Sequence, residues 1–350
     1  MIVDGVCALS ILSLNRLAPL DWEAIYRLII LYNVIAFGFQ ALLGHVLDVY
    51  KAHHFGAAAG LVITAVGAVV VPSAPFAAIM LLGVGNAFFH TGAGAQVFRN
   101  SNGSAAASGM FIAPGAIGLF LGGILAKNQV YPAFVLPVVC VSIILLLLCQ
   151  SPSPVSKLDN LAVHSRHDWR LVIVMLLMLI VLSRTAIGFV LPMMWQGVQK
   201  TGLLFVTAAF IGKFLGGVLS DRFGWLPVTF IMLLTAGCVV AMHQGSLAEA
   251  FFAMLFAQAT TGVTLAATQS LFPNRPAFAF GLPCLAILAG AYPFSLRYPI
   301  MTPPPGLVVA LCLIAAIIII AIKLLPKGET TVFGRKVSTQ ADGTFLMGRD

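Results

Sequence analysis

Residues 42–51 read LLGHVLDVYK, and residues 215–224 read LGGVLSDRFG. Each stretch places a glycine four positions before an aspartate, so that Gly44 and Asp48 in the first correspond to Gly217 and Asp221 in the second. The same offset of 173 positions pairs further residues: Pro19 with Pro192, Trp22 with Trp195, Phe37 with Phe210, Leu42 with Leu215 and Gln96 with Gln269. An offset of 172 continues the series: Gly109 with Gly281 and Gly118 with Gly290. Because matched Pro, Trp and Asp residues seldom arise by chance, we interpret the chain as two copies of one structural unit.

The composition excludes a soluble protein. Of the 350 residues, 60% are hydrophobic and 9% are charged, whereas a soluble domain has roughly 25% charged residues. Charge-free intervals such as 28–47, 100–126 and 298–322 are long enough for membrane helices, which need about 20 residues each. The alternating pattern of a membrane β-barrel does not occur in them. The sequence therefore predicts an all-α membrane protein that crosses the bilayer several times.

Proline, glycine and charged residues divide the chain into about twelve apolar segments. Their cores are 2–18, 24–46, 55–72, 76–97, 104–126, 130–149, 169–195, 203–220, 226–243, 249–271, 277–295 and 305–325. Together with the repeat, this predicts two six-helix bundles with pseudo-symmetry, arranged in parallel because six is an even number. We place the bundles at 1–150 and 169–325, a cytoplasmic linker at 151–168, and a flexible cytoplasmic tail at 326–350.

The distribution of Lys and Arg predicts the orientation. An even number of spans leaves both chain ends on one side of the membrane. That side would hold twelve Lys and Arg residues in its loops and tail, against five on the opposite side. The positive-inside rule therefore predicts that both termini lie in the cytoplasm, and we expect the protein in the cell membrane.

The repeated stretch also resembles a known family signature. The motif G-x-x-x-D-R-x-G, followed by basic residues, joins the second and third helices of each half in the major facilitator superfamily. The second copy here matches at Gly217, Asp221, Arg222 and Gly224; the first keeps Gly44 and Asp48, has Val49 in place of arginine, and has Lys51, His53 and His54 as positive charges. The resemblance spans the chain to about residue 325. It implies two six-helix bundles that rock about a central cavity, and we expect a monomer.

Two shorter stretches carry further resemblances within that superfamily. Gly109, Ala113, Pro114 and Gly118 follow a glycine–proline motif associated with proton-coupled antiporters, although Ala113 stands where the motif has glycine. The stretch that begins at Asn86 is similar to a Phe-His element of the fosmidomycin-resistance branch of efflux proteins. These resemblances imply proton-coupled transport and leave its direction open.

Asp48 and Asp221 are predicted gating residues, together with Gly44, Gly217, Lys51 and Arg222. Each carboxylate has two expected sets of partners: backbone N–H groups at the start of a neighbouring helix, or the basic side chains nearby. The glycines lie one helical turn earlier on the same face and permit close helix packing. The alternative is a solvated loop charge that only ends its helix.

Lys213 and Arg184 are the cations that fall deep inside predicted membrane segments, where each costs about 2.5–3.5 kcal/mol on insertion scales. Lys213 is expected near the membrane midplane, and its repeat counterpart is Gln40. We predict a substrate-binding role for all three, although Lys213 could instead pair with a carboxylate to hold helices together. For Arg184, a cavity position and snorkelling to the outer interface remain equal alternatives.

Asp4 and His90 are the predicted proton-coupling residues. Asp4 lies near the start of the first segment, where it could instead cap the helix; either this helix is short or the natural start lies upstream. His90 can change its charge near neutral pH, but could instead bond a backbone carbonyl. In the resembled family the first, fourth, seventh and tenth helices line the cavity, which implies substrate-binding roles for these further residues: Asn86, His90, Gln258, Thr261 and Thr264, with Thr268 on the same face.

The function expected from these features is secondary active transport of a small polar or anionic solute by alternating access, coupled to protons. The alternatives are a membrane-embedded lipid-modifying enzyme and a transporter-like scaffold or sensor. The sequence contains no HExxH, GxSxG or GxxxxGK[ST] motif, which argues against the enzyme. We expect no cofactor, no metal site and no nucleic-acid partner.

Overall fold

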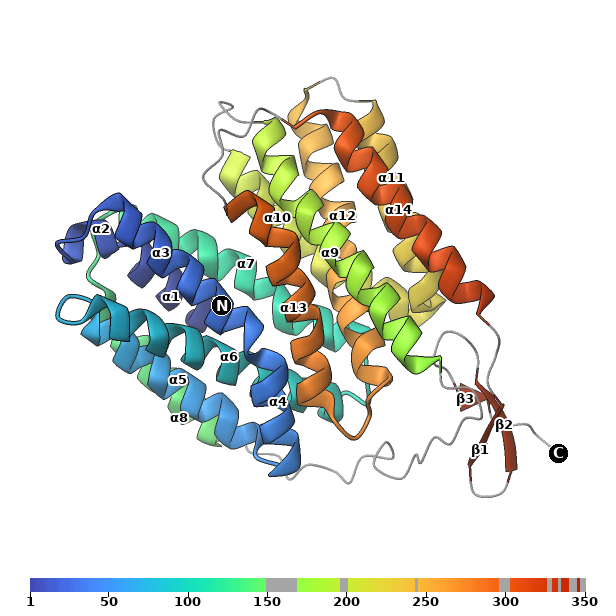
Figure 1. Cartoon of the computed structure of the whole chain (residues 1–350), viewed down its shortest axis with the longest axis horizontal. Coiled ribbons are helices and arrows are strands. Elements are labelled where there is room, and N and C mark those ends of the chain that lie inside the picture. Colours follow the sequence, from blue (N-terminus) through green and yellow to red (C-terminus); the bar gives the residue numbers. More distant parts are fainter. Residues whose placement is uncertain are drawn as a thin grey trace. The chain divides into compact units, whose positions relative to one another are not determined.

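The computed structural model describes residues 1–148, 169–195, 201–242, 245–295, 303–325, 329–332, 335–339 and 345–346. Helices account for nearly all of it (Figure 1). The chain divides into two compact units. Unit 1 comprises Met1–Val97, Phe111–Ser153 and Arg275–Leu288, and unit 2 comprises Phe98–Met110, Pro154–Asn274 and Ala289–Asp350. Each unit thus includes one short segment from the other half of the sequence.

The first half of the sequence forms eight α-helices and two tighter or wider helical turns. They are α1 (Ile2–Leu12), α2 (Leu14–Leu17), α3 (Trp22–Asn33), the π-helical turn η1 (Val34–Gly38), α4 (Gln40–Val49), α5 (His53–Val70), α6 (Pro75–Asn100), α7 (Ala105–Lys127), the 3₁₀ turn η2 (Pro132–Val135) and α8 (Leu136–Leu148). The second half forms α9 (Arg170–Met194), α10 (Thr201–Phe223), α11 (Trp225–Ala241), α12 (Leu247–Ser270), α13 (Pro276–Ser295) and α14 (Pro305–Leu324).

The predicted membrane segments are confirmed. Among the described residues, nine helices are long and apolar enough to span a membrane, with α3, η1 and α4 forming one continuous span. Three shorter apolar helices, at Ile2–Leu12, Pro132–Leu146 and Trp225–Ala241, coincide with the remaining predicted segments. The chain is therefore an all-α multi-pass membrane protein. The predicted linker at 151–168 lies outside the described residues, and the predicted bundle boundaries stay a prediction.

Each unit has its own apolar core, with glycines where its helices cross. In unit 1, Leu14, Leu61 and Ile79 are fully or almost fully buried on α2, α5 and α6. In unit 2, Leu177 on α9 and Leu233 on α11 are buried in the same way. Small residues allow the backbones to approach: Gly60 meets the backbone of α6, and Gly212 and Gly216 meet that of α12. Helix association in lipid depends on such close packing, because the surrounding lipid is as apolar as the helix faces.

The described part of the predicted tail, 326–350, forms β-strands. It contains three short antiparallel strands in the order β1-β2-β3: β1 (Glu329–Val332), β2 (Arg335–Thr339) and β3 (Phe345–Leu346). The first two form a hairpin in which Val332 pairs with Arg335. The β-branched residues of ETTV and RKVST favour this conformation, a signal that the polar and glycine-rich composition of the tail concealed.

Candidate functional site

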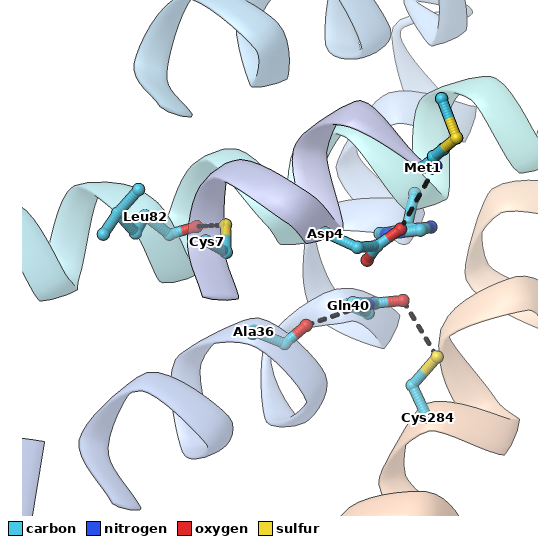
Figure 2. A network of polar contacts seen from close by, with 8 residues as sticks. Met1, Asp4, Cys7, Ala36, Gln40, Leu82 and Cys284 are labelled. Atoms are coloured by element: carbon cyan, nitrogen blue, oxygen red, sulfur yellow. Dashed lines mark hydrogen bonds and ion pairs between the residues drawn. The ribbon is translucent and has the colours of Figure 1, made fainter. Parts of the chain in front are cut away.

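Unit 1 contains a carboxylate–imidazole pair inside its apolar helices. Asp4 on α1 and His90 on α6 lie 86 positions apart in sequence, and His90 Nε2 is 3.0 Å from Asp4 Oδ1. The other carboxylate oxygen, Oδ2, accepts a hydrogen bond from the Met1 amino group at 3.4 Å (Figure 2). Both side chains are mostly buried, at 13% and 17% exposure, so each needs the other as a polar partner. The partner of His90 is therefore a carboxylate rather than the backbone carbonyl of the alternative interpretation.

Glycines of α7 make room for this pair. A Cβ atom at Gly115 would lie 3.0 Å from Asp4 Oδ2. Farther along α7, Gly118 packs against the backbone of Met1, and Gly122 packs against that of Gly5. The stretch that resembles the antiporter motif thus supplies the face on which α1 packs.

Three phenylalanine rings surround the His90 imidazole. Phe89 and Phe111 meet it edge to face, with centroid distances of 5.5 and 6.0 Å, and Phe280 of α13 stacks on it at 6.4 Å with an interplanar angle of 16°. Gly94 permits this arrangement, because a Cβ there would overlap the Phe280 ring. Aromatic side chains of α6, α7 and α13 therefore enclose the imidazole.

Gln40 is fully engaged inside unit 1. It follows the π-helical turn η1, and its Nε2 donates to the Ala36 carbonyl oxygen at 2.6 Å (Figure 2). Its Oε1 accepts from the Cys284 thiol of α13 at 2.9 Å. The side chain is 1% exposed, so it holds the π-turn and the α4–α13 contact together. A π-turn within an α-helical span is uncommon and often marks a functional position.

Asn86 is also buried, at 3% exposure, beside the thiol of Cys7. Tyr32 contacts the same thiol. The thiol also contacts the Leu82 carbonyl oxygen at 3.8 Å (Figure 2). This polar cluster between α1, α3 and α6 could not be predicted from the sequence, since a cysteine in an apolar run gives no signal beyond core packing.

Unit 2 contains a second polar cluster, centred on Arg184 of α9. The side chain is buried, at 5% exposure, and Nη1 donates to Thr261 Oγ1 of α12 at 2.9 Å. Thr261 in turn donates to Gln258 Oε1 at 3.2 Å, and Gly188 leaves room for the Gln258 amide. This placement favours the interior position over snorkelling. It also joins three of the predicted binding residues into one chain of hydrogen bonds.

The other predicted polar residues of unit 2 are placed differently. The Thr264 hydroxyl donates to the Thr260 carbonyl oxygen at 2.9 Å, and the Thr268 hydroxyl donates to the Thr264 carbonyl oxygen at 2.8 Å. Both hydroxyls therefore bond the backbone of their own helix, α12. Lys213 is half-buried on α10. Its carbonyl oxygen packs against Gly109 of α7, which is the counterpart of the contact between Gly281 and the backbone at Gln40 and Ala41.

Asp48 at the end of α4 caps the start of α13. Its Oδ1 accepts from Ala277 N at 3.1 Å and its Oδ2 accepts from Phe278 N at 2.8 Å. His53 Nε2 lies 2.7 Å from Oδ1. The carboxylate is almost completely buried, at 2% exposure, while Lys51 is exposed, with a φ of 52°. A carboxylate at a helix N-terminus satisfies unpaired N–H groups and complements the helix dipole.

Asp221 makes the equivalent contact in unit 2. Its Oδ1 accepts from Ala105 N at 2.7 Å, and its Oδ2 accepts from Ala106 N at 3.1 Å and from Ser104 Oγ at 2.6 Å. These groups begin α7. The Arg222 guanidinium lies over the Phe223 ring, 5.4 Å from its centroid. Each aspartate thus accepts from the N–H groups of a helix start, and Asp48 also contacts the basic side chain of His53.

The comparisons with known proteins add the identity of the fold. No protein-family model and no curated protein matches the chain. Among solved structures, the major facilitator superfamily transporter FucP in an outward conformation has a TM-score of 0.61 at 14% identity, covering 91% of this chain and 96% of FucP. A variant of the E. coli fucose:proton symporter FucP has a TM-score of 0.57 at 15% identity, covering 91% and 96%. An outward-facing bacterial homologue of the iron transporter ferroportin has a TM-score of 0.58 at 14% identity, covering 91% and 97%. The chain has the major facilitator superfamily fold.

Proposed function

We propose that this chain is a secondary active transporter that moves a small polar or anionic solute by alternating access. The observation that supports it is the presence of ionisable side chains in the interior of apolar membrane helices. Asp4, His90 and Arg184 are mostly buried there, although each charge costs about 2.5–3.5 kcal/mol at a membrane helix centre. Packing alone seldom retains such groups, whereas the path of a polar solute through the membrane uses them.

The basic residues favour an anionic or strongly polar solute. Arg184, with Thr261 and Gln258, offers a guanidinium, a hydroxyl and an amide in one connected group, and Lys213 contributes a second cation from α10. A guanidinium binds carboxylate and phosphate groups through two parallel hydrogen bonds. We assign these four residues to substrate binding. Thr264 supports α12, and Gln40 and Asn86 support helices of unit 1.

Proton coupling is assigned to the Asp4–His90 pair. The carboxylate and the imidazole are 3.0 Å apart, and a histidine changes its charge between about pH 5 and 8, so the pair can take up and release one proton. That one of the solved structures with this fold is a fucose:proton symporter supports coupling to protons.

Gating is assigned to the two aspartates with their glycines. Release of the α13 start by Asp48 and of the α7 start by Asp221 would free the helices to separate on one side of the membrane. By the positive-inside rule that side is the cytoplasm, where both termini lie. We assign the protein to the cell membrane, as a monomer without catalytic activity.

Counterflow in proteoliposomes tests the proposal. A thermal-shift screen against carboxylates, phosphorylated metabolites and polar drugs would first select candidate solutes. The purified protein should then exchange labelled for unlabelled solute without any chemical change, and Arg184→Ala and Lys213→Ala should each slow exchange at least tenfold, about 1.4 kcal/mol. Arg27→Ala is the matched control, because that arginine is exposed and pairs with Glu23 of its own helix. A chemically altered product would indicate an enzyme, and absence of exchange with every solute would indicate a scaffold or sensor.

A further inference from the structure

In each repeat, the helix that carries the conserved spacing of glycine and aspartate ends with an exposed aromatic ring beside an exposed cation. In unit 1, α4 ends at Val49 and is followed by Tyr50 and Lys51; in unit 2, α10 ends with Arg222 and Phe223. Tyr50 is 76% exposed and its counterpart at the offset of 173, Phe223, is 58% exposed. Lys51 and Arg222 are exposed as well. The same pair of chemical groups therefore occurs at one position of the repeat.

Both turns lie at a membrane surface. Lys51 has a φ of 52°, and its counterpart at the offset of 173, Gly224, has a φ of 86°. The next helices, α5 and α11, begin at His53 and Trp225, directly after these residues. Each turn thus joins two apolar helices, of which α4, α5 and α10 belong to candidate membrane spans and α11 is a shorter apolar helix. Aromatic and basic side chains at such positions contact lipid headgroups.

The carboxylates near these turns are engaged elsewhere, which leaves the turns positive. Asp48 accepts from the start of α13, and Asp221 accepts from the start of α7. Within the part of the chain that the structure describes, no carboxylate forms an ion pair with Lys51 or Arg222. The guanidinium of Arg222 lies over the Phe223 ring, a contact with the ring face that does not use its N–H groups as hydrogen-bond donors. Both cations can therefore bind an external anion.

We propose that each turn binds the headgroup of an anionic phospholipid, with the cation on the phosphate and the aromatic ring at the boundary with the acyl chains. In unit 1, Phe55 is 70% exposed on α5 and adds a second ring. The exposed Arg275 immediately precedes α13, whose start is bonded to α4, and adds a second cation. An anionic headgroup complements these charges, whereas the choline of a zwitterionic lipid finds no unpaired carboxylate in these turns. This binding does not require transport, so it goes beyond the proposed function.

Native mass spectrometry of the purified, full-length protein tests the proposal, with phosphatidylglycerol and phosphatidylcholine of the same acyl chains as probes. The wild type should bind phosphatidylglycerol at least fivefold more tightly than phosphatidylcholine. Lys51→Gln combined with Arg222→Gln should weaken phosphatidylglycerol binding about fivefold, which corresponds to about 1 kcal/mol from the one cation removed at each turn. Phosphatidylcholine binding should not change. Lys51→Arg combined with Arg222→Lys keeps both charges and should bind as the wild type does.

Two further variants separate this site from a general effect of charge or of apolar surface. Lys323 is an exposed cation in the last turn of α14, outside the two repeated turns, so Lys323→Gln should leave phosphatidylglycerol binding unchanged. Tyr50→Ala combined with Phe223→Ala keeps both cations and should weaken the binding of the two lipids alike, because the rings contact the part that the lipids share.

Equal binding of the two lipids by the wild type would overturn the proposal, and so would an equal loss in Lys323→Gln. Soluble glycerol phosphate that displaces phosphatidylglycerol at an equal concentration would indicate a site for free phosphate and would overturn the lipid assignment. The wild-type comparison needs no variant, so it decides the question even where a variant does not fold. All of these measurements are made without solute, so a failure of the transport proposal would be seen separately, in the counterflow assay.

Discussion

Gly44 on α4 lies directly against the backbone of Ala277 on α13, so close that a Cβ atom at position 44 would overlap the Ala277 carbonyl group. Gly217 on α10 lies in the same way against Ala105 on α7. One helical turn beyond each glycine, an aspartate accepts hydrogen bonds from the N–H groups of the same helix start. The two stretches that repeat in the sequence therefore make the same contact in two separate units.

Replacement of Gly44 by alanine should separate α4 from α13. Alanine favours the helical backbone by about 1 kcal/mol over glycine, but an added methyl group in a tight contact typically costs about 1–3 kcal/mol, and here the neighbour is backbone that cannot rotate away. We expect Gly44→Ala to lower the thermal unfolding midpoint measured in detergent.

The matched control for this substitution is Gly123→Ala on α7. A Cβ at position 123 would meet Leu12 Cδ1 at an ordinary contact distance of 3.7 Å, so this variant should be at least as stable as the wild type. If Gly44→Ala proved as stable as the wild type, α4 and α13 would not lie as close together as the structure shows.

Removal of the charge from the two aspartates should have unequal effects. An asparagine keeps one acceptor oxygen and turns an NH₂ group toward N–H donors, and loss of a helix cap costs about 0.5–2 kcal/mol. We expect Asp48→Asn to destabilise the protein more than Asp221→Asn, because Asp48 is 2% exposed and water cannot replace its partners. Thermal unfolding of both variants, side by side, measures the difference, and a larger loss in Asp221→Asn would contradict the burial argument.

The repeat made these helix contacts predictable before their geometry was known. At an offset of 172, Ala105 and Ala106 correspond to Ala277 and Phe278, so a partner for one aspartate implied a partner for the other. The membrane segments were equally predictable from the sequence, since long apolar runs between charges have few other interpretations.

The side-chain pairs inside the units were harder to predict from the sequence. Asp4 and His90 are 86 positions apart, and Cys284 and Gln40 are 244 positions apart. In a membrane helix both the lipid-facing and the packed faces are apolar, so the sequence pattern does not reveal which residues turn inward. The sequence thus indicated which helices carry polar residues but not that Thr264 and Thr268 bond their own helix while Thr261 bonds Arg184.

Neutralisation of Asp4 should uncouple solute movement from protons. In Asp4→Asn the side chain can no longer exchange a proton with His90, so solute-driven acidification, followed with a trapped pH-sensitive dye, should disappear while counterflow continues. Asp21→Asn is the control, because Asp21 caps α3 by accepting from Ala24 N at 2.7 Å and is exposed. Proton movement retained in Asp4→Asn would remove the pair from the coupling mechanism.

Replacement of Thr261 by valine should expose the dependence of Arg184 on its polar neighbours. Valine fills the same space but cannot accept from Nη1, and a buried donor that loses its acceptor costs about 1–3 kcal/mol. Thr235→Val is the control, since that exposed hydroxyl donates to the Ile231 carbonyl oxygen in its own helix. If Arg184 binds the solute, an anionic solute replaces the missing acceptor, so it should raise the unfolding midpoint of Thr261→Val by more than that of the wild type. An equal shift in both proteins would mean that the solute does not reach the guanidinium.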